Sequence, residues 1–494
     1  MSERMESGDK DLREATISGV QWIAAARVLT EVVALASSVF LARLIPPAAF
    51  GHAAVALVVV GSSVIVGPAG ISAFVVQRRD LTHDHLASTV LLTYTFGICL
   101  SAATAVFGLT LGESIFGDSS GKLIALAAPA WFLTAIGGVS QSIMQRELDF
   151  RKIAVRDMAA AMIGTTTAVV LALAGIDAPA LVIGALMLVA VVGLSSAIAA
   201  PQPFPVLDRG ALREISGFAT SVSLSSIVYT LYKNVDYVIL SIRLPAAQVG
   251  YYLRAYQLGV DYQSKLSSIM LRVSFPIFSR ADDISQLRRF RNTIVRMHAT
   301  ILLPLLATFA VMAPDVIPFL YGEAWEPVVR PAQILAVAGM AYAITTGTGP
   351  VMLALGRART LLNWNLFELV AYTTLIVILA GAGLIAVSIG VALYGVATIF
   401  LIQFFILGPA IGMTLEDLWH DVHAGMAAAA LLVVTGVALR ELMEPSVPVV
   451  VRLLVVAAWS FGLTVAAYRW LFPAVYRDLL SVTPNRGRRA RAAT

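Results

Sequence analysis

The stretch QVGYYLRAYQLGVDYQSKLSSIMLRVSF, residues 248–275, is long enough to cross a membrane, yet it carries four charged side chains. These are Arg254, Asp261, Lys265 and Arg272. At about 100° per residue, a regular α-helix places the four within about 40° of one another, over roughly 27 Å of its length. Each charge in hydrocarbon costs at least ~2.5–3.5 kcal/mol. We therefore expect this stripe to line a wet, net cationic cavity inside a helical bundle.

The composition of the whole chain favours a membrane protein. Hydrophobic residues make up 58% of the 494 residues and charged residues 13%, with a mean hydropathy of +0.82. Soluble domains are about 45–50% apolar and about 25% charged. The single cysteine, Cys99, excludes an intrachain disulfide and indicates no thiol metal site. The sequence shows no nucleotide loop, no metal-ligand spacing and no nucleophile–base signature, so we expect no cofactor, no metal ion and no enzymatic activity.

Fourteen segments are apolar over the 17–25 residues that a membrane span needs. They predict an all-α polytopic membrane protein. The connections at Gly175 and Gly383 are very short, so the spans on either side of them are the hardest to separate. The predicted spans are residues 15–42, 50–76, 87–111, 122–145, 153–174, 178–200, 214–241, 248–275, 292–313, 329–355, 360–381, 384–411, 419–439 and 449–472.

The Lys and Arg residues of the connecting segments predict the orientation. With the N-terminus in the cytoplasm, all but six of them fall on the cytoplasmic side. The basic residues are mostly arginine and alanine is abundant, which indicates a bacterial genome of high GC content, so we expect both termini in the bacterial cytoplasm and the spans in the plasma membrane. The basic tail around Arg488 fits contact with anionic membrane lipids better than contact with nucleic acid. The six exceptions are Arg43, Lys122, Arg243, Arg330, Arg440 and Arg452.

A short motif recurs six spans apart and in the same orientation. Residues 40–51 read FLARLIPPAAFG, and residues 239–250 read ILSIRLPAAQVG. The repeat predicts two pseudo-symmetric six-helix lobes related by an axis along the membrane normal, a transporter design with the substrate site between the lobes. The predicted parts are a cytoplasmic segment (1–14), an N-lobe (15–200), a cytoplasmic linker (201–213), a C-lobe (214–411), two C-terminal spans (412–472) and a basic cytoplasmic tail (473–494).

Several stretches carry a family resemblance: residues 41–51, GISAFVVQRRDLT (70–82), NVDY (234–237), GYYLRAYQL (250–258) and FPIFSR (275–280). Over about residues 15–300 the chain resembles the polysaccharide transporter family of the multidrug/oligosaccharidyl-lipid/polysaccharide exporter superfamily, which contains the O-antigen and other lipid-linked oligosaccharide flippases. The resemblance implies fourteen helices, alternating access and a cationic central cavity. It also implies undecaprenyl-pyrophosphate-linked glycans as substrates, and a polysaccharide polymerase or export machinery as a partner.

Basic residues inside spans are the candidates for holding a pyrophosphate, because arginine binds phosphate through its bidentate fork and lysine as a point charge. Arg254 is the strongest of them because it also lies in a family-like stretch. Tyrosine and neighbouring polar side chains can stack on sugar rings and bond their hydroxyls. The pyrophosphate candidates are Arg27, Lys233, Arg254, Lys265 and Arg272, and the glycan or cavity candidates are Ser225, Tyr229, Tyr232 and Gln257.

Three acids inside spans have two readings. Glu31, Asp236 and Asp261 could carry protons or sodium, or each could simply neutralise a base one turn away on its own helix. Arg78 and Arg79, at the predicted cytoplasmic end of the second span, are candidate gate residues or plain topology and lipid anchors.

Two other functions compete with a flippase. A multidrug exporter of the same superfamily would prefer an acidic or aromatic cavity, which the three bases and one acid of residues 248–275 disfavour. A membrane glycan polymerase or ligase would need a sizeable catalytic loop outside the cytoplasm. The longest such loop, at about residues 314–328, is short and contains no histidine.

Overall fold

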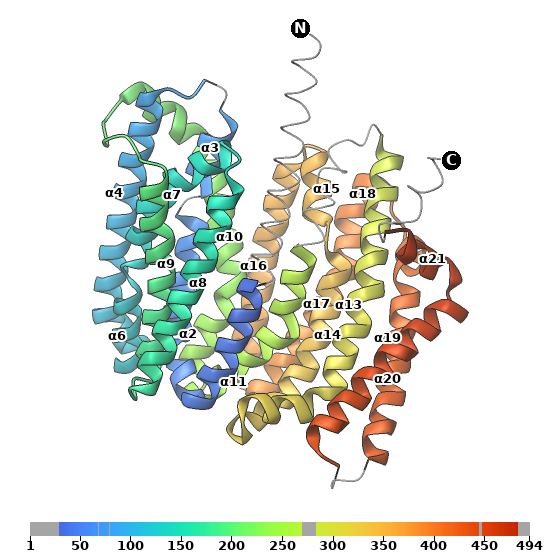
Figure 1. Ribbon diagram of the computed structural model, residues 1–494. Coiled ribbons are helices and arrows are strands. Elements are labelled where there is room, and N and C mark those ends of the chain that lie inside the picture. Colours follow the sequence, from blue (N-terminus) through green and yellow to red (C-terminus); the bar gives the residue numbers. More distant parts are fainter. Residues whose placement is uncertain (1–28, 68, 79, 269–282, 444–446, 483–494) are drawn as a thin grey trace, which may run out of the picture. The chain divides into compact units, whose positions relative to one another are not determined.

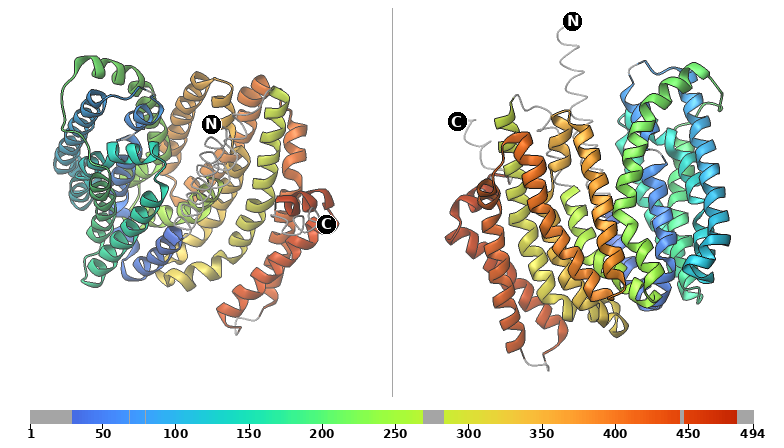
Figure 2. Two further views of the ribbon diagram at one scale, coloured as in Figure 1. Left: turned by 45° about the horizontal axis from the view of Figure 1, so that its top comes forward. Right: turned by 180° about the vertical axis from the view of Figure 1, so that it is seen from behind.

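The computed structural model describes residues 29–67, 69–78, 80–268, 283–443 and 447–482. Within these ranges the chain forms long α-helices joined by short turns, and no β-strand occurs (Figures 1 and 2). The all-α fold class predicted from the sequence is therefore confirmed.

Eleven helical segments of the described residues are long and apolar enough to cross a membrane, and each overlaps a predicted span, although some ends differ by up to about ten residues. The protein is thus a multi-pass membrane protein. Of the other three predicted spans, residues 214–241 lie on α10 (Arg209–Arg243), while the first and eighth are described only from residue 29 and up to residue 268. The total of fourteen remains a prediction. The eleven segments are Pro47–Val66, His83–Phe116, Asp118–Arg146, Phe150–Leu173, Ala178–Ala199, Ile284–Tyr321, Glu323–Ala354, Arg359–Ala380, Leu384–Ile411, Leu415–Leu442 and Val449–Trp470.

Local signals set many of the helix ends. The helices α4 (His83–Phe107) and α19 (Leu415–Leu442) begin with capping boxes at Thr82 and Thr414. Gly175 and Gly383 have positive φ angles of 80° and 91°, which glycine adopts without steric cost. These two turns separate α8 (Phe150–Leu173) from α9 (Ala178–Ala199), and α16 (Ala358–Ala380) from α17 (Leu384–Ile402). The short connections therefore lie where the sequence predicted them.

Two caps at helix starts are acidic. Asp149 accepts a hydrogen bond from the backbone N–H of Lys152 at the start of α8, and the side chain of Lys152 lowers the pKa of this carboxyl. Asp283 caps α13 (Ile284–Tyr321) in the same way, and the hydrogen bond from Ser285 lowers its pKa. A carboxylate at a helix start is stabilised by the unpaired N–H groups and by the helix dipole.

The chain divides into two compact units. Unit 1 contains residues up to Gly250 together with Glu368–Thr373, and unit 2 contains the remainder. This division leaves α10 in unit 1, whereas the repeat predicted a lobe boundary at residues 201–213. The lobes therefore remain a prediction from the sequence.

Unit 1 is a bundle of helices packed through small residues. A Cβ atom on Gly164 of α8 would lie 2.7 Å from the carbonyl oxygen of Gly184 on α9, so the two backbones approach as closely as glycine allows. The helices of unit 1 besides α4, α8, α9 and α10 are α2 (Pro47–Val66), α3 (Ala69–Gln77), the π-helical η1 (Gly108–Gly112), α5 (Glu113–Phe116), α6 (Asp118–Ala127) and α7 (Ala130–Arg146).

Unit 2 is organised around α13, which packs along α19. Ion pairs join the two helices near both ends: Arg296 Nη2 lies 3.1 Å from Asp421 Oδ1, and Arg440 Nε lies 2.5 Å from Asp315 Oδ2. The other elements of unit 2 are α11 (Ala246–Tyr256) from Tyr251 onward, the π-helical η2 (Gln257–Asp261), the 3₁₀ helix η3 (Glu323–Val328), α14 (Val329–Thr345), α15 (Thr348–Ala354), most of α16, α17, the π-helical η4 (Gln403–Leu407), α18 (Gly408–Ile411), α20 (Val449–Trp470) and α21 (Pro473–Val482).

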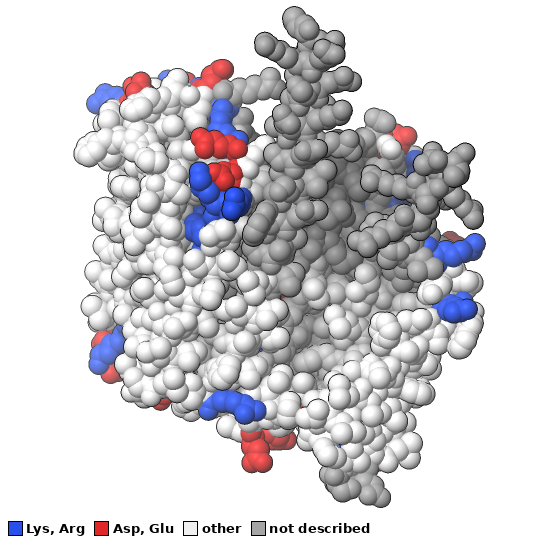
Figure 3. All heavy atoms as spheres, in the orientation of Figure 1, with Lys and Arg blue, Asp and Glu red and all other residues white. Residues whose placement is uncertain are grey.

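Few charged side chains lie on the middle of the face that Figure 3 shows. In Figure 3, most of the face in view is uncharged, and the Lys, Arg, Asp and Glu side chains gather towards the ends of the helices. Large apolar side chains such as Ile198 (80% exposed) and Val434 (69% exposed) cover the outside. Hydrocarbon can solvate such a surface and water cannot, which agrees with a membrane location.

Candidate substrate-binding site

Arg254 lies in an aromatic enclosure in unit 2. Its guanidinium carbon is 4.9 Å from the ring centroid of Tyr321, at the end of α13, and 5.3 Å from that of Trp325, in η3. Its Nη1 donates to Oε1 of Gln257 at 2.8 Å, and only 2% of the residue is exposed. Ring faces stabilise a desolvated guanidinium, so the pocket holds the charge without exposing it to water. This enclosed position differs from the wet surface that the sequence predicted, and the role of Arg254 towards phosphate stays a prediction.

The helix that carries Arg254 is not regular. Residues Ala246–Tyr256 form α11, Gln257–Asp261 form the π-helical segment η2, and helix then continues to residue 268. A π turn contains more residues than an α turn, so it rotates every later side chain back around the axis. The helical wheel that aligned Arg254 with Asp261 and Lys265 assumed one uniform α-helix, and that assumption is wrong here. Such π segments occur frequently at functional sites.

Other residues of the predicted stripe are partly buried or undescribed. Lys265 is half-buried, with its Nζ 5.2 Å from the ring centroid of Tyr262. Asp261 is also half-buried, and both side chains have interaction partners. Arg272, together with Arg27 and Arg79, lies outside the described residues.

Unit 1 contains a buried cluster of acids and tyrosines. The hydroxyl of Tyr372 donates to Asp236 Oδ2 at 3.1 Å, and the hydroxyl of Tyr232 lies 3.5 Å from Glu368 Oε1. Asp236 is 0% exposed and Glu368 9% exposed, and the two tyrosine rings meet edge to face at 5.6 Å. Lys233 Nζ is 6.0 Å from the Tyr232 ring. Two carboxylates with hydroxyl donors can hold a proton or a small cation.

This cluster combines predicted and missed residues. The sequence singled out Tyr232, Lys233 and Asp236 on α10, and the structure brings them together. The sequence made neither Glu368, an acid inside a predicted span, nor Tyr372 a site candidate; both come from α16, more than 130 residues later. The signal that could have found them is an acid inside an apolar span with a tyrosine one turn later, a spacing that puts both on one helix face.

The remaining glycan and coupling candidates are less enclosed. Tyr229 is 43% exposed on α10, and Ser225 on the same helix is half-buried with an interaction partner. Glu31 is half-buried on the helix described from residue 29, and it too has a partner. None of these placements assigns a role.

Arg78, the described gate candidate, is held in place at the end of α3. Its Nη1 lies 2.5 Å from Glu214 Oε2 on α10, and its guanidinium carbon is 5.3 Å from the ring centroid of Phe74. Glu214 Oε2 is also 3.3 Å from Nε2 of His85. Arg78 is thus paired with an acid within unit 1, and its role as a gate residue or as a topology and lipid anchor stays a prediction.

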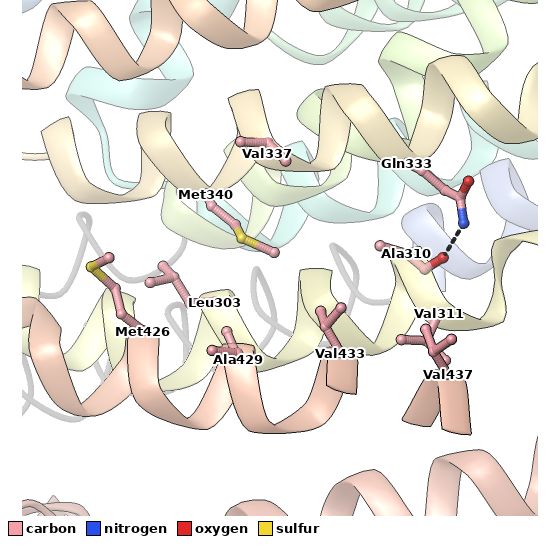
Figure 4. A pocket seen from close by; sticks show the side chains of 11 residues that line it. Leu303, Ala310, Val311, Gln333, Val337, Met340, Met426, Ala429, Val433 and Val437 are labelled. Atoms are coloured by element: carbon pink, nitrogen blue, oxygen red, sulfur yellow. Dashed lines mark hydrogen bonds between the residues drawn. The ribbon is translucent and has the colours of Figure 1, made fainter. Parts of the chain in front are cut away.

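Unit 2 also contains an apolar groove of about 450 Å³ between α13, α14 and α19 (Figure 4). Gln333 contributes the only polar side chain among the lining residues, and its Nε2 donates to the carbonyl oxygen of Ala310 at 2.8 Å instead of facing a ligand. The groove suits hydrocarbon and offers nothing to a charged head group. The described residues contain no group of three or more His, Cys, Asp or Glu side chains placed to hold a metal ion.

Similar proteins place this arrangement in a family. A family model described as "Polysaccharide biosynthesis protein" matches residues 40–330, more than half of the chain. The lipopolysaccharide biosynthesis protein WzxC of Escherichia coli (strain K12) is 26% identical over 438 residues, covering 87% of this chain and 89% of that protein. The succinoglycan biosynthesis transport protein ExoT of Rhizobium meliloti (strain 1021) is 24% identical over 336 residues, covering 67% and 68%.

Solved structures agree on the fold. The lipid II flippase MurJ in an inward closed conformation superposes with a TM-score of 0.71 at 13% identity, covering 91% of this chain and 99% of that one. An inward-facing multidrug resistance MATE transporter of the MOP superfamily gives a TM-score of 0.59 at 16% identity, covering 81% and 95%. The chain is therefore a member of the polysaccharide biosynthesis protein family, with the fold of the multidrug/oligosaccharidyl-lipid/polysaccharide exporters.

Proposed function

We propose that the protein is a flippase that carries a lipid-linked oligosaccharide, of the undecaprenyl-pyrophosphate type, across the bacterial plasma membrane by alternating access. Membership of the polysaccharide biosynthesis family carries this proposal. The names of two relatives, a lipopolysaccharide biosynthesis protein and a succinoglycan biosynthesis transport protein, support it. On this proposal the protein moves its substrate without breaking a bond in it, and both termini lie in the cytoplasm.

The physical task explains why such a substrate needs a protein. A lipid pyrophosphate carries about two negative charges, and desolvated charges and unpaired glycan hydroxyls each cost several kcal/mol in hydrocarbon. Buried cations offset this cost for the head group, while the isoprenoid chain needs only an apolar surface. The groove between α13, α14 and α19 offers such a surface for a hydrocarbon chain.

The basic residues predicted from the sequence remain the head-group candidates. Arg254 is enclosed by Tyr321 and Trp325 in this conformation, so we propose that the phosphate reaches it only after these rings move apart. Arginine is suited to this change, because it stays charged throughout and exchanges ring faces for phosphate oxygens. Lys233, Lys265 and the undescribed Arg27 and Arg272 complete the candidate set.

The driving force need not be an ion gradient. Moving one charge through 100 mV is worth about 2.3 kcal/mol, so two negative charges leaving a negative interior gain roughly 5 kcal/mol. The acid–tyrosine cluster around Asp236 and Glu368 is where a proton or sodium ion would couple to transport. We propose this cluster as the coupling site if a gradient contributes.

The test is flipping of a fluorescent undecaprenyl-pyrophosphate oligosaccharide in liposomes, for wild type, Arg254→Ala and Arg272→Ala. We expect transport by wild type and at least a tenfold loss in both variants at equal insertion. Arg359→Ala, an exposed arginine on α16, serves as the matched control and should transport like wild type. If folded wild type moves no glycan lipid under proton, sodium or voltage gradients but extrudes cationic drugs, the multidrug exporter replaces this proposal.

A further inference from the structure

The two copies of the repeated motif meet each other in unit 1. Gly51, the fifth residue of α2, and Gly250, the fifth residue of α11, occupy equivalent positions in the two copies. A Cβ atom on Gly51 would lie 1.8 Å from the carbonyl oxygen of Ala246, and one on Gly250 would lie 2.0 Å from the carbonyl oxygen of Pro47. Because Pro47 and Ala246 are themselves equivalent as first residues of the two helices, the contact is reciprocal.

This crossing is made by backbone alone. Each glycine Cα faces the first carbonyl of the opposite helix, the arrangement in which Cα–H···O contacts form between closely packed helices. A side chain as small as alanine would need the two backbones to separate, since the calculated Cβ–O distances are far below van der Waals contact. The closed crossing therefore depends on both glycines.

The helix starts on both sides are stiff. Pro46 and Pro47 precede and open α2, and Pro245 directly precedes α11, so the backbone angles there are restricted. No flexible side chain lies between the two glycines and the opposite carbonyls to adjust the spacing. A rigid contact of this kind is either made or broken as a whole.

One feature opposes closure. The side-chain oxygen Oε1 of Gln248, which lies between Ala246 and Gly250 on the same turn of α11, is buried without a hydrogen-bond partner. A buried, unpaired amide oxygen is destabilising and is relieved when water reaches it. An opening of the crossing that let water reach this oxygen would relieve that cost.

We propose that the Gly51–Gly250 crossing is a gate, closed when the two repeat copies touch and open when they part. The proposal rests on the alternating access of the proposed function, in which the two lobes that carry the copies move relative to each other. Gly164 and Gly184 make a similar close contact between α8 and α9, but both belong to one predicted lobe, and we expect that contact to stay closed throughout transport.

The first experiment locks the gate. Ala48→Cys and Ala247→Cys, one turn before the two glycines, are introduced together in a Cys99→Ser chain and bridged with reducible thiol cross-linkers of increasing length. We expect the shortest effective cross-linker to abolish glycan-lipid flipping in liposomes, and reductant to restore it. Full transport by the cross-linked protein would overturn the gate, because the contact would not need to open.

The second experiment prevents the two helices from packing closely at the crossing. Gly51→Ala and Gly250→Ala in the double-cysteine chain should shift cross-linking to longer reagents and reduce transport at least fivefold. Two controls separate gating from packing. Gly61→Ala adds a methyl group on α2 where no atom lies within 4 Å, and Gly164→Ala adds one where an oxygen lies at 2.7 Å inside one lobe. Both should leave the cross-linking profile unchanged, although Gly164→Ala should unfold at a lower temperature.

The outcomes also distinguish this gate from the proposed function. If wild type flips no glycan lipid but moves another substrate, and the cross-link abolishes that transport reversibly, the gate stands and the substrate assignment fails. If the profile is the same in wild type, Gly51→Ala and Gly250→Ala, the gate fails whatever the substrate. If an alanine variant does not fold, the reversible cross-link on the glycine-containing chain still decides the question.

Discussion

In unit 1, Asp236 is fully buried and accepts a hydrogen bond from Tyr372, whereas in unit 2 Arg254 is 2% exposed and lies against the rings of Tyr321 and Trp325. Both sites remove a charge from water with the help of tyrosines, but one uses hydroxyl groups and the other ring faces. A carboxylate can become neutral by taking a proton, while an arginine stays charged. The acid cluster can thus change its charge, whereas the arginine enclosure can only open or close.

The largest effect should come from breaking the acid cluster. Asp236→Ala removes the acceptor of the Tyr372 hydroxyl and leaves Lys233 without the acid one turn away on α10. We expect the free energy of unfolding in detergent to fall by about 1–3 kcal/mol, the cost of leaving the buried donors that Asp236 now accepts from without a partner, and we expect transport to be lost.

Chemical unfolding monitored by tryptophan fluorescence measures this effect. Tyr372→Phe is the matched variant, because it deletes only one hydroxyl group, and it should cost about 1–2 kcal/mol. Equal stabilities of Asp236→Ala and wild type would show that the carboxylate contributes nothing to this unit.

An intermediate effect should follow from changing the enclosed cation while keeping its charge. Arg254→Lys replaces a flat guanidinium with a compact ammonium that stacks less well on two rings and loses its hydrogen bond to Gln257. We expect a loss of about 1–2 kcal/mol in unfolding free energy, measured in the same way. The exposed Arg359→Lys is the control, and a similar loss there would remove the ring faces as the cause.

The smallest effect should come from the partly exposed pair at the end of α3. Glu214 is 51% exposed, so water screens its attraction for Arg78. We expect Glu214→Gln to leave transport within twofold of wild type and to change the unfolding temperature least of the three. If Glu214→Gln lost transport while its unfolding temperature stayed unchanged, that result would instead support Arg78 as a gate residue.

Much of the fold was predictable because each span is a continuous run of apolar residues that can be recognised from its own sequence. Hydrocarbon thickness fixes the length of an apolar helix, so the eleven spanning segments agree with predicted spans. The turns at Gly175 and Gly383 were predictable because only a short, glycine-containing connection separates the apolar runs. The candidate site was less predictable. The predicted alignment of Arg254 with Asp261 and Lys265 assumed a regular α-helix, but η2 is π-helical. The spacing of apolar residues does not reveal a π turn.

The sequence by itself determined that this chain is a helical membrane protein, roughly where most spans lie, and which charged residues must be sheltered. These follow from composition and spacing, which act over a few turns of helix. Only the tertiary structure decided which groups shelter those charges and which backbones touch. Tyr372 reaches Asp236 across 136 residues, and Gly51 meets the start of α11 almost 200 residues later. Such contacts depend on how whole helices pack. The spacing of apolar residues along one helix does not predict which side chains of a distant helix will lie against it.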